Sequence, residues 1–282
     1  MSYLARIRAC NNFEPSAAVP WRIQQTTYGY IQPTFAARLA AWPDVFVTQA
    51  DAIYLHPKLS NYETRTEAIA AVMFELHQQG VIDTWVNEPY AVNLAFEQTP
   101  ELALERAASS FFGLKTYGVH INGLVRKADG IYVWVGTRAL DKPFWPGKLD
   151  QIVAGGQPMG LSLLDNVIKE SQEEANIPMQ LAQQAQAVGS VSYQQVGRRG
   201  LDNSTIYIYD LWLPDDFVPE NTDGEVLGFQ LLPLADIARL TEQTTEFKDN
   251  CNLVNIDLLL RLGYLNAQHP EYQAIRQALY HL

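Results

Sequence analysis

Residues 155–177 constrain this chain most, because a double glycine there precedes a strongly acidic helical pattern. Glu173 and Glu174 follow Glu170 at offsets of three and four, which places the three side chains on one helical face. Neighbouring carboxylates repel one another unless a cation lies between them. A divalent cation such as Mg²⁺ would suit this position, because hard ions prefer carboxylate oxygen and leave positions open for phosphate. The pattern predicts a metal-binding helix, with a merely solvated acidic face as the alternative.

The sequence also marks the ends of this helix. Ser162 is a suitable N-terminal cap, with Asp165 three residues later. Asn176 tolerates the left-handed conformation that ends many helices, and Pro178 prevents continuation. The face away from the glutamates is expected to be buried, and it comprises Leu164, Ile168, Ser171 and Ala175.

The two glycines lie where a strand is expected to end. Gly155 and Gly156 follow the apolar residues 152–154, and their backbone N–H groups, free of Cβ bulk, are suited to approach a phosphate. A simple turn would use the same residues. The glycines favour phosphate binding only in combination with the acidic helix.

The whole stretch resembles the Nudix box, in which a glycine is followed by Glu, Arg-Glu, a Glu-Glu pair and a closing apolar residue. Gly155 matches the first glycine, and Ile177 matches the closing residue. Glu170, Glu173 and Glu174 match the family's metal ligands. The resemblance implies hydrolysis of a diphosphate with Mg²⁺ or Mn²⁺ as cofactor.

Four positions depart from the family pattern: Leu161 replaces Glu, Lys169 replaces Arg, Ser171 replaces an apolar residue and Asn176 replaces Gly. In the family, the first Glu and the Arg help to hold loop and helix together, so this brace is altered. Asp165, four residues before Lys169, is a candidate for a substitute ion pair. Because the three glutamates are intact, we expect catalysis to be retained.

The flanking segments resemble one Nudix subfamily, the module fused to thiamine pyrophosphokinase in some fungi and free-standing in plants and bacteria. The matching segments are residues 28–33, 45–46, 65–70, 80–92, 105–120, 116–150, 207–211 and 223–226. This subfamily carries an additional N-terminal region. The resemblance implies an α/β fold, with a Nudix α/β/α sandwich around a mixed sheet at residues 116–282. A smaller α+β domain is expected at residues 1–115.

Hydrophobic periodicity agrees with this division. In the N-terminal part it predicts strand-like alternation at residues 46–55 and helices at residues 33–41, 65–79 and 100–112. In the C-terminal part it predicts strands at residues 118–127, 131–137, 187–196, 205–213 and 226–232. Helices are expected there at residues 234–243, 250–263 and 271–280.

Charge and composition exclude several classes of function. The 282 residues carry a net charge of −11 without a basic stripe, which argues against a nucleic-acid partner. No apolar run approaches the ~20 residues that span a membrane, and the start lacks a secretory apolar region. Cys10 and Cys251 are expected to be free structural thiols in a cytoplasmic protein. The sequence leaves the oligomeric state open, a homo-oligomer included.

Further candidate site residues lie outside the acidic helix. Lys148 and Trp145 in an aromatic loop, and Arg199 in an Arg-Arg-Gly turn, are candidates for contacts with phosphate or a flat ring. Glu225 precedes an expected strand, and Nudix proteins often use a second acidic residue from a distant loop. The resemblance therefore makes Glu225 a candidate base, with a turn residue as the alternative. His120, on an apolar strand, is expected to be a satisfied core residue.

The function implied by the resemblance is metal-assisted hydrolysis of thiamine diphosphate, or of its oxidised analogues, to the monophosphate. The cation would neutralise phosphate charge and activate a water, whose proton Glu225 or a box glutamate would take. The second hypothesis is a nucleoside-diphosphate-sugar pyrophosphatase of the ADP-ribose type, since the same metal site would serve it. The third is a non-catalytic ligand sensor, against which the three intact glutamates argue.

Overall fold

The strands predicted at residues 118–127 and 131–137 form the centre of a seven-stranded sheet in the computed structural model, which describes residues 2–281. The sheet runs in the order β11-β12-β7-β8-β13, with β10 paired to β7 and β9 to β8. Its strands are β7 (Lys115–Lys127), β8 (Gly130–Arg138), β9 (Leu149–Gln151), β10 (Val153–Gly156), β11 (Gln186–Gly197), β12 (Gly200–Trp212) and β13 (Val226–Pro233). Because β12 and β7 are parallel and the other pairs antiparallel, the sheet is mixed, as predicted.

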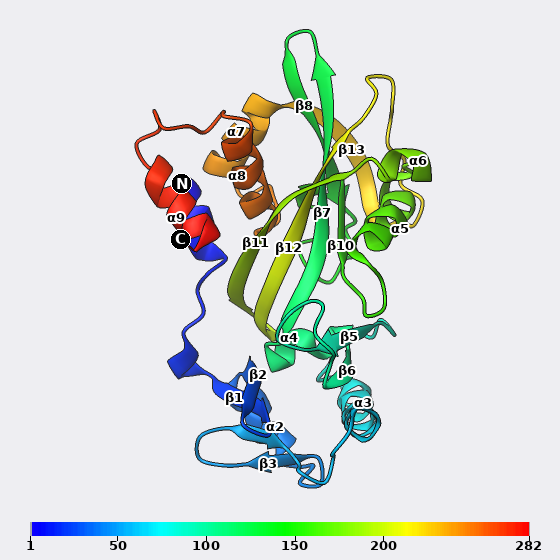
Figure 1. Ribbon diagram of the computed structural model, residues 1–282, viewed down its shortest axis with the longest axis vertical. Helices are drawn as coiled ribbons and strands as arrows, with labels where there is room; N and C mark the ends of the chain where they lie inside the picture. Colours follow the sequence, from blue (N-terminus) through cyan, green and yellow to red (C-terminus); the bar gives the residue numbers. More distant parts are fainter. Residues whose placement is uncertain (1, 282) are drawn as a thin grey trace.

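Helices cover both faces of this sheet (Figure 1). Side chains alternate along β7, so that Ile121 packs toward α5 (Leu163–Ala175) and α6 (Met179–Ala182), whereas Leu124 packs toward α7 (Leu234–Gln243) and α8 (Cys251–Arg261). The resulting α/β/α sandwich confirms the predicted fold class.

The N-terminal helix α1 (Tyr3–Ala9) packs on the C-terminal part of the chain. Ile7 is fully enclosed with Leu253 of α8 and Ile275 of α9 (Tyr272–Tyr280). The two ends of the chain therefore lie side by side beside the sandwich (Figure 1). The first residues thus share a core with residues 116–282 rather than with the rest of residues 1–115.

Residues 15–112 form a smaller α+β layer, the N-terminal layer, with its own core around Trp21, Phe46 and Phe112. A four-stranded sheet has the order β2-β1-β4-β3, and β5 pairs with β6. The strands are β1 (Val19–Ile23), β2 (Thr26–Ile31), β3 (Phe46–Thr48), β4 (Ile53–Leu55), β5 (Pro89–Val92) and β6 (Leu102–Glu105). The helices are η1 (Pro15–Ala17), α2 (Pro33–Leu39), α3 (Tyr62–Gln78), η2 (Arg106–Ala108) and α4 (Ser109–Phe112).

Two local predictions are wrong. Residues 100–112 are not one helix, because Leu102 and Leu104 are buried in β6, paired to β5, and only the short η2 and α4 follow. On α5, Leu164 is 43% exposed, whereas Glu174 is buried next to Ala175. The acidic side of this helix thus lies at the edge of the buried face instead of opposite to it.

No helix within residues 2–281 combines the length and the apolar character needed to cross a bilayer.

Candidate active site

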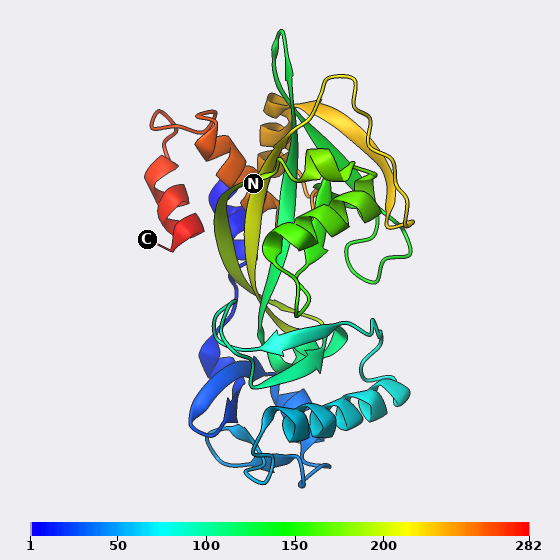
Figure 2. The same cartoon turned by 45° about the vertical axis from the view of Figure 1, so that its right-hand side comes forward.

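A cleft of about 800 Å³ lies between the sandwich and the N-terminal layer. Both parts line it: Gly155, Gly156 and Glu170 come from the sandwich, and Tyr90 and Arg106 come from the N-terminal layer. The loop from β10 into α5 reaches down to β5 (Figure 2), where the Met159 amide donates to the Pro89 carbonyl over 3.0 Å. The cleft therefore joins the acidic helix to residues that are distant in sequence.

Glu174 is anchored in the floor of this cleft. Its Oε2 accepts a hydrogen bond from the Ala154 amide over 2.8 Å, which ties α5 to β10. Burial, together with the negative charges of Glu170, Asp150 and Glu225, raises the pKa of Glu174 well above its usual range. A cation near this carboxylate would therefore be strongly favoured.

Glu170 reaches the glycine pair. A Cβ placed on Gly155 would lie 2.3 Å from Cδ of Glu170, so only glycine permits this approach. Burial raises the pKa of Glu170, although Lys169 opposes the shift. A side chain at this position would therefore displace the Glu170 carboxylate from the glycine pair.

Lys169 lies between two of the acidic side chains. Its Nζ is 3.1 Å from Glu170 Oε1 and 2.7 Å from Glu173 Oε2. The predicted Asp165–Lys169 pair is absent from the described residues, because Asp165 instead accepts from the Ser162 hydroxyl over 2.6 Å at the helix start. Within residues 2–281, the three glutamates do not bring one oxygen each within 4.8 Å of the others.

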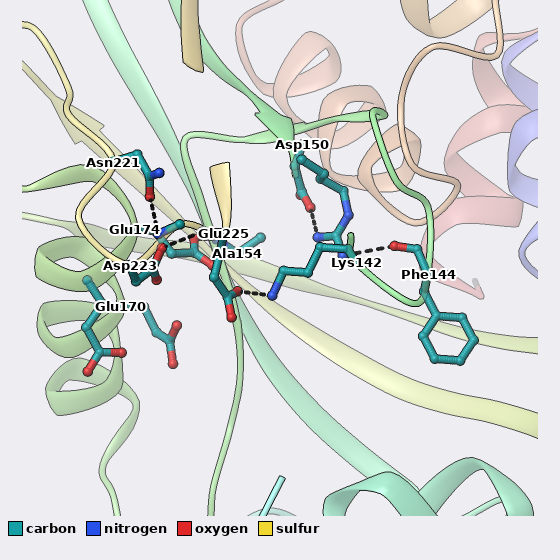
Figure 3. Close-up of polar contacts among 12 residues, drawn as sticks. Lys142, Phe144, Asp150, Ala154, Glu170, Glu174, Asn221, Asp223 and Glu225 are labelled. Atoms are coloured by element: carbon teal, nitrogen blue, oxygen red, sulfur yellow. Dashed lines mark hydrogen bonds and ion pairs between the residues drawn. The ribbon is translucent and has the colours of Figure 1, made fainter. Parts of the chain in front are cut away.

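Glu225 lies in the loop before β13, beside the same cleft. Its carboxylate is 2.5 Å from Lys142 Nζ, the contact drawn in Figure 3. The loop is held by its own side chains, since the amides of Gly224 and Glu225 donate to Asn221 and Asp223 over 3.0 and 2.8 Å. Glu225 and Glu174 line one small hollow, so the long connection before β13 brings a second acidic residue to the helix.

The wall opposite the helix is aromatic and cationic. Phe144 and Trp145 line the cleft, and the Arg199 guanidinium lies 4.3 Å from the centroid of the Phe144 ring. Arg199 also pairs with Asp83 of the N-terminal layer, and Arg198 does so over 2.5 Å. Lys148 lies outside the cleft, where its ammonium donates to the Thr245 carbonyl.

Comparison with curated proteins identifies the family. The chain is 39% identical over 274 residues to "Nudix hydrolase 24, chloroplastic" of Arabidopsis thaliana, covering 96% of this chain and 75% of that protein. It is 38% identical over 288 residues to "Nudix hydrolase 20, chloroplastic" of the same plant, covering 98% and 77%. The chain belongs to the Nudix hydrolase family.

Two further similarities are local or structural. Residues 2–116 match a family model described as a domain of unknown function (DUF4743). A MutT protein from Methanosarcina mazei Go1 is similar at a TM-score of 0.40 and 17% identity, covering 54% of this chain and 96% of that one. The family membership rests on the two plant relatives, and it makes this chain a hydrolase.

The Nudix box of this chain is braced by amides rather than by Glu and Arg. The fully buried Asn166 donates to the Gly156 carbonyl over 2.9 Å, and Gln157 donates to the Leu161 carbonyl over 2.8 Å. The predicted caps are confirmed, since the Ser162 hydroxyl accepts from the Asp165 amide and Asn176 has a φ of 50°. The sequence did not predict this brace, because a single amide side chain belongs to no repeating pattern. The available signal was the pair of amides, Gln157 and Asn166, on either side of Leu161.

Nudix hydrolases generally use divalent metal ions, and the acidic side chains here fit one. Glu170 and Glu174 face the cleft, and the negative charges of Glu170 and Glu225 add to the burial that raises the pKa of Glu174. A divalent cation would remove this repulsion, and carboxylate oxygens are its preferred ligands. These carboxylates therefore suit a divalent metal ion.

A second group of ligand-type side chains is better explained as an ion network. His120, Asp150 and Cys251 bring one ligand atom each within 4.8 Å of one another, and all three are buried. Asp150 is already balanced by Arg138 at 2.9 Å and Lys248 at 3.2 Å. These two cations would repel a metal ion, so the group does not resemble a cation site.

His120 and the cysteines behave as expected from the sequence. His120 is buried with Nδ1 2.7 Å from Gln151 Oε1, and burial lowers its pKa to about 4. Cys10 and Cys251 are free and buried, and the Cys251 thiol donates to Asp150 over 2.8 Å. Cys10 belongs to the core around α1, and Cys251 belongs to the core around α7 and α8.

Proposed function

We propose that this Nudix hydrolase cleaves small organic diphosphates, with thiamine diphosphate and its oxidised analogues as substrates and the monophosphate as product. The observation that carries the proposal is the cleft itself, in which acidic box residues face an aromatic and cationic wall. The segments that resemble the thiamine-associated subfamily support this choice of substrate.

The box residues would bind the cofactor and the diphosphate. When bound, Mg²⁺ or Mn²⁺ would neutralise phosphate charge and make a water more acidic. Glu170 and Glu174 would hold the cation, and Glu173 would join them after leaving Lys169, which contacts it over 2.7 Å. Gly155 and Gly156 leave space for a phosphate beside the helix.

Glu225 is the proposed general base. It would take a proton from the water as the water oxygen attacks phosphorus. The bridging P–O bond then breaks, and its electron pair goes to the leaving phosphate, which takes a proton from solvent. The ion pair between Glu225 and Lys142, at 2.5 Å, holds this carboxylate at the cleft.

The wall of Phe144, Trp145 and Arg199 is proposed to bind the organic part of the substrate. A flat heterocycle gains from stacking against aromatic rings and from a guanidinium group stacked on a ring face. Arg199 already lies against Phe144, so the wall is ordered before the substrate arrives.

Two further expectations stay as proposals. A cytoplasmic location is proposed from the two free, buried cysteines, Cys10 and Cys251, whereas the names of the two plant relatives call those proteins chloroplastic. We also propose residues 1–115 and 116–282 as the two domains, with α1 docked on the second one.

A comparison of substrates tests the function. Purified protein with Mg²⁺ or Mn²⁺ is offered thiamine diphosphate, its oxidised analogues and ADP-ribose, and the phosphorus-containing products are measured. We expect monophosphate and inorganic phosphate from the thiamine compounds. AMP from ADP-ribose, with intact thiamine compounds, would instead identify a pyrophosphatase of the ADP-ribose type and refute the proposal.

A further inference from the structure

The N-terminal layer touches the second box glycine. A Cβ on Gly156 would lie 1.9 Å from the Tyr90 hydroxyl and 3.3 Å from Arg106 Nη2. Both residues line the cleft, together with Glu170. The glycine loop and these two side chains, more than 45 positions away in sequence, thus form one surface.

The hairpin of β5 and β6 fixes both side chains in place. Pro89 pairs with Glu105 and Tyr90 with Leu104, so that Arg106 follows directly after the last pair. The Arg106 amide donates to the Glu88 carbonyl over 2.9 Å, and its Nη1 is 2.8 Å from Glu88 Oε2. Its guanidinium lies 5.8 Å from the centroid of the Tyr90 ring. The side chain is therefore oriented from two sides.

The charge of Arg106 lies where a diphosphate would need it. The guanidinium group carries five N–H donors. Nη1 of Arg106 donates to Glu88, whereas Nη2 lies next to Gly156 of the glycine loop. The box itself carries Lys169 where the family has Arg, and this lysine contacts two glutamates. A guanidinium donor at the loop is thus supplied from outside the box.

We propose that Arg106, positioned by Tyr90 and Glu88, binds the diphosphate of the substrate at the Gly155–Gly156 loop, so that the N-terminal layer completes the active site. This inference rests on the proposed function, because it assigns one more residue to the same cleft.

Arg22 provides a matched control for Arg106. Arg22 also belongs to the N-terminal layer, pairs with a carboxylate, Asp51, over 2.7 Å, and lies 5.8 Å from the centroid of a tyrosine ring, Tyr54. It does not line the cleft. Substitution of Arg22 therefore removes the same kind of interactions without touching the site.

The test measures KM, kcat and the binding of inorganic pyrophosphate with Mn²⁺ by calorimetry, for full-length Arg106→Gln, Arg106→Lys and Arg22→Gln. We expect Arg106→Gln to weaken pyrophosphate binding and raise KM by roughly tenfold to hundredfold, the range for a lost charge-assisted hydrogen bond. Arg106→Lys should recover part of the loss, because it restores the charge without the planar fork. Arg22→Gln should match the wild type in both measurements.

Several results would overturn the proposal. One is wild-type pyrophosphate binding and KM in Arg106→Gln, and another is an equal loss in Arg22→Gln, which would reveal a general structural effect. Absence of pyrophosphate binding by the wild type would refute it as well. A wild-type protein that binds pyrophosphate through Arg106 but leaves thiamine diphosphate intact would refute only the proposed substrate, since calorimetry requires no turnover.

Discussion

Glu174 shows how burial makes an acidic side chain favour a nearby cation. Its carboxylate is held by the Ala154 amide and is surrounded by Glu170, Asp150 and Glu225, so its negative charge is costly without a nearby cation. The same side chain on an exposed helix would be an ordinary solvated acid. The chemistry thus depends on the position of α5 against β10.

Glu170→Gln and Glu174→Gln should each lower kcat/KM by about 10³-fold, because an amide is a poor ligand for a divalent cation. Glu174→Gln should also melt at a temperature no lower than the wild type when metal is absent, since it removes a buried charge. Steady-state kinetics and thermal unfolding with and without Mn²⁺ check both statements. Glu63→Gln, on the exposed start of α3, is the control. Full activity of either variant would refute the ligand assignment.

His120 should make stability depend on pH. Burial lowers its pKa from 6.5 to about 4, so the unfolded chain takes up a proton first as the pH falls. The contribution of neutral His120 to the free energy of unfolding is fully present above pH 6.5 and is lost progressively as the pH falls toward 4. The difference of about 2.5 units corresponds to about 3 kcal/mol.

Urea unfolding of the wild type and His120→Gln between pH 7 and 4 measures this effect. The variant should lack the loss of stability that His120 causes between pH 6.5 and 4. The pKa of Asp150 is lowered in the folded protein, so Asp150 also reduces stability as the pH falls, but only at more acid pH. Parallel pH curves for the two proteins would contradict the prediction.

Among the elements, the join between β10 and α5 decides whether the site is rigid. Asn166 and Gln157 replace the lost Glu–Arg brace by donating to the Gly156 and Leu161 carbonyls. Both hydrogen bonds join residues that are close in sequence. They depend on the conformation of the loop, which the hydrophobic periodicity of the sequence does not predict.

Asn166→Ala should therefore destabilise the protein by about 1–3 kcal/mol, because it leaves the half-buried Gly156 carbonyl without this partner. We also expect kcat to fall, since the glycine loop loses its tether to α5. Chemical unfolding and steady-state kinetics provide the measurement. Unchanged stability and kcat would show that the brace lies elsewhere.

At the scale of the whole molecule, the placement of α1 links the two ends of the chain. Ile7 is 2% exposed and packs with helices from the last 35 residues, so the N-terminal helix is part of the sandwich core. Cutting the chain after residue 115 would remove α1 from this core. It would also remove Tyr90 and Arg106 from the cleft.

Ile7→Ala should cost about 2–5 kcal/mol, the range for removing a large buried aliphatic side chain. Val218→Ala, at a side chain that is 67% exposed, should change stability by less than about 0.5 kcal/mol. Urea unfolding of both variants tests the difference. Equal and small effects would mean that α1 contributes little to the core.

The sequence by itself determined the features that are encoded locally. The periodicity of residues 118–127 and 205–213 predicted β7 and β12, and Ser162 and Asn176 marked the two ends of α5. The glycine and glutamate spacing was sufficient to indicate the family, because those residues act within one strand, one loop and one helix. The acidic helix could be read from a period of 3.6 residues alone.

Only the tertiary structure decided which distant side chains meet. Leu102 and Leu104 became a strand because β5 lies beside them, and Glu174 was buried because β10 covers that edge of α5. Arg106 reaches Gly156 through a contact between two packed parts of the chain. No local pattern encodes such a contact, since it arises from the free energy gained when whole elements bury their apolar faces together.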